Sequence, residues 1–456
     1  MLLSKLKLYE GLRFEGRVHS TKENDMRKRK PIKQGPLGGK RIGLIAGPEF
    51  SDFQAYYLIQ YLSEFGAEVV NLVIGWPGVA WKFTRPATSD VVTGTFGLRL
   101  DPIPTMKPGE RYTSLTLRDS ASLTAEMATE FDGVIVLGGH SADVLRADKV
   151  VTEFVCSAYD NGAVVGALEC GQMVLMSAGL CHGKNLTGYK VIQPFLNRLG
   201  NFQDVPVVRD GRFVTARDSD ACAEFVRELS AIFNPSYEDD KQNVLEGYRI
   251  LIVAGQDFED VELCVPAMEL TWRGAEITLG TFLPPVVSRP PMLGLDVVMG
   301  NFGMSVPFQE LRAEKYPVVP LSELTPDEFD AIIIPGAFCP WHCIEDGYVV
   351  ELVKQFYEAE KIVAAICHGP LVLAAADLVD GKKIAGTPAC GDDVVTMGAN
   401  YNYDWPAVID GTIVTAREPD DVPEFLDAIT EAMLARQSIS TTSSPKLAAA
   451  TIADVN

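Results

Sequence analysis

Short runs of apolar, mostly β-branched residues alternate with amphipathic stretches along most of the chain. In the second half, continuous apolar runs predict buried strands, and helical periodicity predicts the segments between them. The predicted strands cover residues 249–254, 276–279, 331–334 and 362–366, and the predicted helices cover 261–273, 349–360 and 369–376. Apolar strands that alternate with helices are typical of a parallel sheet covered on both faces. We therefore expect an α/β sandwich of flavodoxin-like type.

The chain contains an internal duplication. Segments in its first half match segments in its second half at offsets that drift only from 198 to 208 residues. The matched pairs are 131–139 with 329–337, 167–172 with 365–370, 210–217 with 410–417, and 41–47 with 249–255. So narrow a range of offsets indicates two copies of one domain rather than a solenoid of short repeats.

The duplication predicts two tandem α/β domains, at residues 41–233 and 248–436. A linker with Pro, Ser and acidic residues is expected at 234–247. A basic arm, residues 1–40, precedes the first domain, and a segment rich in Ser, Thr and Ala, residues 437–456, is expected to be a mobile tail. We expect the two copies to pack together as an intramolecular pseudo-dimer, and further homo-oligomerisation stays open.

Charge is distributed unevenly along this chain of ordinary globular composition. The 456 residues carry a net charge of −21, yet residues 1–40 hold 11 Lys and Arg against 4 Asp and Glu. The acidic remainder repels phosphate backbones, so no nucleic-acid partner is expected for the folded part. The basic run at residues 27–31 has two interpretations, a solvated arm or a nuclear-import signal.

Membrane insertion and secretion are not expected. No apolar run approaches the roughly 18 residues of a membrane-spanning helix, so no membrane partner is expected. The first residues also lack the apolar core of a secretory signal, which favours a cytoplasmic location. The nine cysteines are then expected to be reduced thiols, and one with a chemical role must be identified from its neighbours.

Residues 362–370 have the pattern of a strand, a sharp turn and a helix. The apolar strand stops at Cys367, His368 follows, and Gly-Pro opens the next helix. A nucleophile elbow holds its side chain on such a turn, beyond the carboxyl edge of the sheet. The helix N-terminus is expected to lower the pKa of the thiol, and His368 can exchange its proton. The alternative is a Cys-His pair with a purely structural role.

These residues belong to an ordered series of motifs that resembles the DJ-one/PfpI (ThiJ) superfamily. The series comprises residues 258–263, Pro335-Gly336, 365–370, 391–393, 410–411 and 416–417. It covers essentially the whole second copy and, more weakly, the first. The resemblance implies two tandem flavodoxin-like (class I glutamine amidotransferase-like) α/β sandwich domains.

The resemblance also implies roles for individual residues of the second copy. Cys367 is implied as the nucleophile and His368 as its proton-transfer partner. Glu259 is implied as the carboxyl group that hydrogen-bonds the cysteine and stays protonated, because burial beside a thiolate raises its pKa. The backbone N–H groups of Ala337 and His368 are implied as the oxyanion pair. Taken alone, Glu259 has a simpler interpretation as a carboxylate at a helix start.

The first copy departs from the family pattern. Glu169 stands where the nucleophile is expected, Cys170 replaces the histidine, and Ser51 occupies the position of Glu259. We interpret this copy as inactive in thiol chemistry, with a different carboxylate reaction as the alternative.

One departure in the second copy suggests that the two copies share a site. In PfpI-type members a carboxylate after the Pro-Gly-Gly turn orients the histidine across a dimer interface, but Trp341 stands there in this chain. The equivalent residue of the first copy is Asp143. Our hypothesis is that Asp143 completes a triad with His368 and Cys367 across the pseudo-dimer, and an ordinary helix N-cap is the competing interpretation.

The resemblance points to a cysteine-dependent enzyme acting on a small reactive carbonyl. The favoured activity is glyoxalase III-like, converting methylglyoxal to a hydroxy acid without glutathione, and neither a cofactor nor a metal is expected. The first alternative is a C–N bond hydrolase, whether deglycase, amidase or PfpI-type cysteine peptidase, with the same nucleophile. The second is a non-enzymatic stress chaperone or redox sensor whose Cys367 is oxidised.

Overall fold

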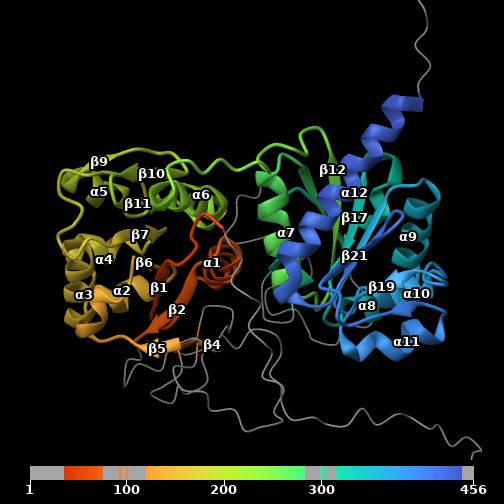
Figure 1. The fold of residues 1–456 in the computed structure, drawn as a ribbon, viewed down its shortest axis with the longest axis horizontal. Coiled ribbons are helices and arrows are strands. Elements are labelled where there is room, and N and C mark those ends of the chain that lie inside the picture. The colour runs from red at the N-terminus through yellow and green to blue at the C-terminus, as the bar shows by residue number, and fades with distance from the viewer. Residues whose placement is uncertain are drawn as a thin grey trace, which may run out of the picture.

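The computed structural model describes residues 35–74, 92–93, 99–100, 120–282, 298–300, 305–306 and 315–443. Two α/β units, each built on its own sheet, follow one another along the chain (Figure 1). The first sheet contains β1 (Arg41–Ala46), β2 (Glu68–Val73), β5 (Ser120–Ser122), β6 (Gly133–Val136), β7 (Val164–Leu168), β10 (Val207–Asp210) and β11 (Phe213–Ala216). The helices of this unit are α1 (Asp52–Glu64), α2 (Ser141–Leu145), α3 (Lys149–Asp160), α4 (Gln172–Ser177), α5 (Gln193–Leu199) and α6 (Cys222–Phe233).

The second unit repeats this arrangement. Its sheet contains β12 (Arg249–Gly255), β13 (Glu276–Phe282), β16 (Val318–Pro320), β17 (Ala331–Ile334), β18 (Ile362–Ile366), β21 (Ala407–Asp410) and β22 (Ile413–Ala416). Its helices are α7 (Asp260–Trp272), α8 (Cys339–Asp346), α9 (Tyr348–Glu358), α10 (Pro370–Ala375), α11 (Gly391–Thr396) and α12 (Val422–Ser443). Four short pairs are added: β3 (Val92–Thr93) with β4 (Arg99–Leu100), β8 (Asn185–Leu186) with β9 (Asn201–Phe202), β14 (Val298–Met299) with β15 (Ser305–Val306), and β19 (Lys383–Ile384) with β20 (Asn400–Tyr401).

The two seven-stranded sheets have the same topology. The first has the order β10-β11-β7-β6-β1-β2-β5, and the second, read from its other end, has the order β21-β22-β18-β17-β12-β13-β16. Only the outermost pairs, β10 with β11 and β21 with β22, are antiparallel. The duplication predicted from the sequence is therefore also a duplication of strand order. The fold is two flavodoxin-like (class I glutamine amidotransferase-like) α/β sandwiches in tandem, as predicted.

Strand β18 lies inside its sheet and ends at the site of interest. It pairs in parallel with β17 on one side and β22 on the other, and all five of its residues are buried. A strand covered on both faces needs a continuous apolar sequence, which Ile-Val-Ala-Ala-Ile supplies. The residues that follow β18 emerge at the carboxyl edge of the parallel strands, where α/β folds place their functional groups.

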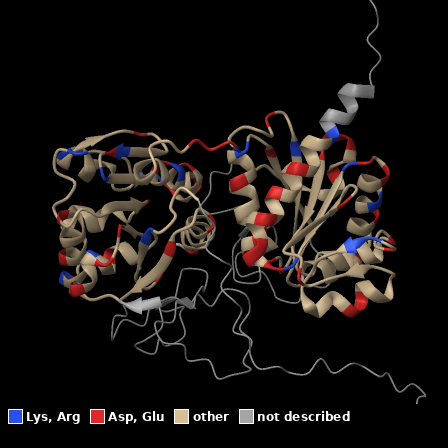
Figure 2. Cartoon of the chain, viewed as in Figure 1, with Lys and Arg blue, Asp and Glu red and all other residues tan. Residues whose placement is uncertain are grey.

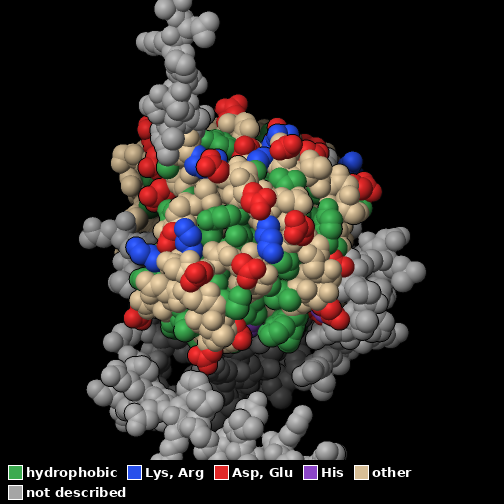
Figure 3. Space-filling view, turned by 90° about the vertical axis from the view of Figure 1, so that its right-hand side faces the viewer, with side chains coloured by type: hydrophobic (Ala, Val, Ile, Leu, Met, Phe, Trp, Pro, Cys, Tyr) green, Lys and Arg blue, Asp and Glu red, His purple; other side chains and the backbone are tan. Residues whose placement is uncertain are grey.

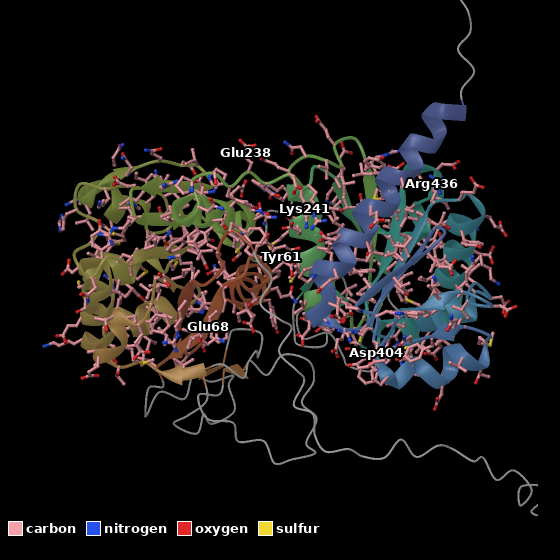
Figure 4. All side chains as sticks on the ribbon, viewed as in Figure 1. Tyr61, Glu68, Glu238, Lys241, Asp404 and Arg436 are labelled. Carbon is pink, nitrogen blue, oxygen red and sulfur yellow. The ribbon has the colours of Figure 1, made fainter. Side chains whose placement is uncertain are left out.

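The two units contact each other through the helices that follow their first strands. Helices α1 and α6 of the first unit pack on α7 of the second, and α1 also contacts α12. Within this interface Tyr57 donates a hydrogen bond to the buried carboxylate of Glu269, which also accepts from Arg227 at 2.7 Å. Tyr61 lies at the same boundary between the units (Figure 4). The expected pseudo-dimer contact therefore has a buried polar centre.

The outer surface carries mixed charges. Acidic side chains are spread over both units, including the helices at their boundary (Figure 2). On the outer face of the second unit, acidic, basic and apolar side chains are interspersed (Figure 3). None of the helices in the described ranges combines the length and the apolar character that crossing a membrane requires. The basic run at residues 27–31 lies outside the described residues.

The end of the second unit differs from the prediction. Helix α12 continues to Ser443, so the first residues of the segment expected to be a mobile tail are helical. Residues 437–443 contain neither Pro nor Gly, and the first Pro stands at position 445. No helix-breaking residue therefore interrupts the chain between 436 and 443.

Candidate active site

Cys367 stands at the turn between β18 and α10. Its backbone is left-handed, with φ of 60°, and its N–H donates to the carbonyl of Ala416 on β22 at 3.1 Å. A non-glycine residue rarely adopts this conformation, and such strain is typical of a nucleophile elbow. As a whole residue, Cys367 is partly buried. The structure thus has the strand, turn and helix that the sequence predicted around Cys367.

His368 lies beside this thiol. Its ring Nδ1 is 3.3 Å from the Cys367 Sγ. Burial lowers the pKa of His368, so the ring is neutral near pH 7 and able to accept a proton. Thiol and base are therefore paired at a distance that permits proton transfer.

Glu262 brings a carboxyl group to the same sulfur. It lies in the first turn of α7, is fully buried, and its carboxyl group hydrogen-bonds to Cys367. Its Oε2 also accepts the N–H of Gly336 at 2.7 Å. Burial raises the pKa of Glu262 to about 8, despite the opposing hydrogen bonds from Gly336 and Cys367. At neutral pH this carboxyl is largely protonated and can donate a hydrogen bond.

The prediction for Glu259 is wrong in its geometry. Glu259 is the N-cap of α7, and its Oε2 accepts the backbone N–H of Glu262 at 2.8 Å. The two glutamates are three residues apart, so one caps the helix while the other lies inside its first turn and reaches the thiol. Glu259 is also buried, and its pKa is raised, first by burial and then by the charges of Glu262 and Asp260.

Glu262 is the functional candidate that the sequence reasoning missed. A signal for it was present, because the residue at the matching place in the first copy is Gln54, a near-isostere of glutamate, whereas Glu259 matches Ser51.

Ala337 presents its backbone N–H to the thiol. This N–H donates a hydrogen bond to the Cys367 sulfur and lowers its pKa. Ala337 is left-handed, with φ of 54°, and it follows Gly336, where an added Cβ would lie 2.6 Å from the Cys367 Cβ. Only glycine allows this close approach of the loop to the elbow. The predicted Ala337 donor therefore faces the Cys367 sulfur.

The net effect on the pKa of Cys367 differs from the sequence prediction. Burial raises the pKa most, and the charges of Glu262 and Glu259 raise it further, whereas the Ala337 N–H lowers it. Burial therefore outweighs the helix N-terminus that was expected to lower the pKa. The sulfur is therefore a protonated thiol at neutral pH, and His368 is placed to accept its proton.

The first unit has the same turn with different chemistry. Glu169 is left-handed, with φ of 58°, and its Oε2 accepts the N–H of Gly139 at 3.0 Å and the side-chain amide of Gln54 at 3.0 Å. Gly139 matches Ala337, so this N–H holds a carboxylate oxygen in the first unit. The adjacent Cys170 has its pKa raised to about 12, chiefly by burial.

Asp143 does not reach the site of the second unit. It is exposed on α2, close enough to Cys170 for its charge to raise the pKa of that thiol. Helices α2 and α10 lie at opposite ends of the pair of units (Figure 1). The predicted triad across the pseudo-dimer is wrong because the units meet through α1, α6, α7 and α12, which leaves α2 facing away. Among the described residues, no carboxylate is hydrogen-bonded to the His368 ring.

The described residues contain no group of three His, Cys, Asp or Glu side chains arranged to hold a metal ion. Cys339 and Cys343, which the sequence brings close to His342, are both buried, with their sulfur atoms 3.8 Å apart.

The chain is similar in sequence to several known proteins. Protein DJ-1 homolog D of Arabidopsis thaliana is 26% identical over 310 residues, which is 66% of this chain and 77% of that protein. A deglycase of Pyrococcus abyssi is 31% identical over 174 residues, 38% of this chain and 92% of that protein. A two-domain structure from Anabaena variabilis, with DJ-1/ThiJ/PfpI-like and ferritin-like domains, is 30% identical over 42% of this chain and 48% of that chain, with a TM-score of 0.35.

A sequence model of the DJ-1/PfpI family matches the chain twice, at residues 40–232 and 248–432. The two matches coincide with the two α/β units, and the second contains the Cys367 elbow. The chain is therefore a tandem member of the DJ-1/PfpI family.

Proposed function

We propose that the protein is a cysteine-dependent enzyme that converts a small reactive dicarbonyl such as methylglyoxal to a hydroxy acid. The observation that carries the proposal is the convergence of three groups on one sulfur. A neutral imidazole lies 3.3 Å from the Cys367 Sγ, the Ala337 N–H donates to it, and the Glu262 carboxyl hydrogen-bonds it. Base, oxyanion donor and proton carrier are the groups that reversible thiol addition to a carbonyl requires.

In the proposed first step, the Cys367 sulfur attacks the aldehyde carbon while His368 takes the thiol proton. The new C–S bond breaks the carbonyl π bond, and the resulting alkoxide is stabilised by the Ala337 N–H before it is protonated to a hemithioacetal. The first unit supports this role of the loop, because the equivalent Gly139 N–H binds a carboxylate oxygen there.

The next steps are proton transfers, and they need no external oxidant or reductant. A base, His368 or ionised Glu262, removes the proton from the former aldehyde carbon, and the neighbouring carbon receives one. The hydroxyl proton of the hemithioacetal moves to the neighbouring carbonyl oxygen, which gives a hydroxyacyl thioester on Cys367. Water then cleaves the C–S bond, releasing the hydroxy acid and the thiol. The dicarbonyl plus one water equals the product, so the balance needs no cofactor. The carboxyl of Glu262 suits proton transfer because its pKa of about 8 is near neutral pH.

A second candidate is a deglycase, a hydrolase that releases carbonyl adducts from amines or thiols. Proteins named deglycase from Pyrococcus abyssi, Pyrococcus furiosus and Thermococcus kodakarensis favour it, at 30–31% identity over 38% of this chain. The nucleophile and the oxyanion donor would be the same, and the substrate would carry an amine or thiol leaving group.

The test is incubation of the purified protein with methylglyoxal, following dicarbonyl loss and lactate formation. We expect turnover by the wild type, loss of turnover in Cys367→Ala, and retention in the matched control Cys170→Ala. Release of amine from a preformed adduct, without consumption of the free dicarbonyl, would instead favour the deglycase. Casein cleavage would favour a peptidase, and reversible oxidation of Cys367 without any turnover would favour a redox sensor.

A further inference from the structure

The oxyanion donor Ala337 is held in a backbone conformation that alanine does not favour. Its φ is 54°, whereas the matching Gly139 of the first unit has φ of 79° and, as glycine, adopts it without strain. A left-handed non-glycine residue is strained and persists only where its surroundings fix it. The second unit therefore depends more than the first on the restraints that fix this turn.

Asp257 supplies the nearest restraint. Its backbone carbonyl accepts the N–H groups of Phe338 at 3.1 Å and Cys339 at 3.2 Å, the two residues directly after Ala337. The following residue, Phe258, forms an antiparallel bridge with Ala337 itself. Asp257 is also left-handed, with φ of 58°. The strained turn at Ala337 is therefore held by hydrogen bonds to a second strained turn, at Asp257.

His342 ties this second turn to α8. Its Nε2 lies 3.4 Å from the Asp257 Oδ2, and the Gln256 side-chain amide donates to the other carboxylate oxygen at 3.2 Å. The side chains of His342 and Asp257 are only 11% and 5% exposed, so water competes little for this contact. His342 lies one turn into the helix that starts at Cys339, and the pair links that helix back to the turn that orients Ala337.

The first unit lacks this link. The residue that matches His342 is Val144, and the acid that matches Asp257 is Glu49. Glu49 instead lies 3.6 Å from His140, whose side chain is 79% exposed. The buried pair thus occurs in the unit where the oxyanion donor is alanine.

We propose that His342, acting through Asp257, is a positioning residue that keeps the Ala337 N–H directed at Cys367. The proposal deepens the proposed function and concerns the same site, but its main test does not require carbonyl turnover. The test follows iodoacetamide alkylation of Cys367 at neutral pH by mass spectrometry of the intact protein and its peptides. The Ala337 N–H stabilises the thiolate, so its displacement slows alkylation.

We expect His342→Leu to slow alkylation of Cys367 about tenfold, the effect of one pKa unit on the thiolate fraction. His342→Gln, whose amide can still donate to Asp257, is expected to stay within about twofold of the wild type. The matched control His140→Leu removes the exposed pair of the first unit and should leave the rate unchanged. Should His342→Leu fail to fold, His342→Asn replaces it, because its shorter amide does not reach Asp257.

A double-mutant cycle separates positioning from general loosening. Glycine at position 337 adopts the turn without a restraint, so His342→Leu should slow alkylation much less in an Ala337→Gly background than in the wild type. Equal slowing in both backgrounds, equal slowing by His342→Gln and His342→Leu, or an unchanged rate in His342→Leu would each overturn the proposal. If no carbonyl substrate is turned over but the cycle behaves as expected, the proposed function fails and the positioning role stands.

Discussion

The carboxyl group of Glu262 hydrogen-bonds the thiol of Cys367 and also accepts the N–H of Gly336. In the first unit, the side-chain amide of Gln54 likewise donates to Glu169 and accepts the N–H of Gly138. An amide can hold a hydrogen bond, but it cannot exchange a proton at neutral pH. The unit that retains the thiol is therefore also the unit that retains an exchangeable proton beside it.

Replacing Glu262 by glutamine tests this relationship. We expect Glu262→Gln to fold and to lower dicarbonyl turnover about 10²- to 10⁴-fold, the range that a lost acid–base group costs. The measurement is the initial rate of methylglyoxal loss at neutral pH. Glu259→Gln is the matched control and should cost less than tenfold in rate, since that residue caps α7. A larger loss in Glu259→Gln than in Glu262→Gln would contradict the assignment.

The raised pKa of Glu262 also predicts how stability changes with pH. Its pKa is about 8 in the folded protein and near 4.5 in the unfolded chain, so the folded state binds the proton more tightly. This contribution to stability is complete below the unfolded pKa and is lost as pH rises through about 8. Glu262→Gln carries no charge at any of these pH values, so the variant does not lose this stability. Its free energy of unfolding minus that of the wild type should therefore increase by about a few kcal/mol between pH 5 and pH 9.

Urea unfolding of both proteins at several pH values measures this difference. Glu68→Gln is the control and is compared with the wild type in the same pH series, since Glu68 is half-exposed on the surface. A constant difference between Glu262→Gln and the wild type across the range would show that the Glu262 carboxyl is already ionised at pH 5.

The elbow of the first unit is expected to be dispensable for turnover. Glu169 already occupies its own oxyanion donor, and the pKa of Cys170 is raised to about 12. Glu169→Ala and Cys170→Ala should each stay within about twofold of the wild-type rate with methylglyoxal. A loss in Glu169→Ala comparable with that in Cys367→Ala would assign chemistry to the carboxylate, the alternative raised from the sequence.

Asp143 gives a direct test of the corrected geometry. It is exposed on α2, at the far end of the molecule from α10, so Asp143→Ala should leave turnover and its pH profile unchanged (Figure 1). His368→Ala should lower turnover at least a hundredfold, because it removes the base 3.3 Å from the thiol. A pH profile shifted by Asp143→Ala would revive contact between that carboxylate and the site.

Most of the fold could be predicted from the sequence because local signals agree with it. Strand β18 is a continuous apolar run, and its buried position requires one. The internal duplication in the sequence was sufficient to predict two similar sheets, one in each half of the chain. Helix α8 is missing from the predicted helices, and its Cys-Pro-Trp-His-Cys start is too short to show helical periodicity. Its helical state depends on Pro340 in the first turn and on the anchoring of Cys339 by Asp257.

The residue pattern alone could pair parts of the site only where they are adjacent in the chain, and the Ala337 donor came from the family resemblance. Cys367 and His368 are neighbours, so the elbow pattern was sufficient to pair them. Glu259 and Glu262 are both acidic and both near the start of α7, and only the helical turn decides which one faces the thiol. The error at Asp143 had another cause, because the packing of the two units depends on side chains of α1 and α7 that no local pattern singles out.

The packing of the two units also leads to a prediction about stability. Glu269 is fully buried at the boundary between the units, where it accepts hydrogen bonds from Tyr57 and from Arg227 at 2.7 Å and lies 3.4 Å from Arg273. Glu269→Ala leaves two buried guanidinium groups without this partner, and removal of one member of a buried ion pair costs about 3–5 kcal/mol. We expect a loss of that size in urea unfolding.

The control is Glu130→Ala, which breaks the half-exposed pair with Arg41 and should cost less than about 1 kcal/mol. Because Tyr57 and Arg227 come from the first unit and Glu269 from the second, the loss should also weaken the coupling between them. Glu269→Ala is therefore expected to unfold in two separate transitions if the wild type unfolds in one, as followed by tryptophan fluorescence and circular dichroism. A stability loss no larger than that of the control would mean that the interface is held by its apolar contacts alone, with the buried charges contributing nothing net.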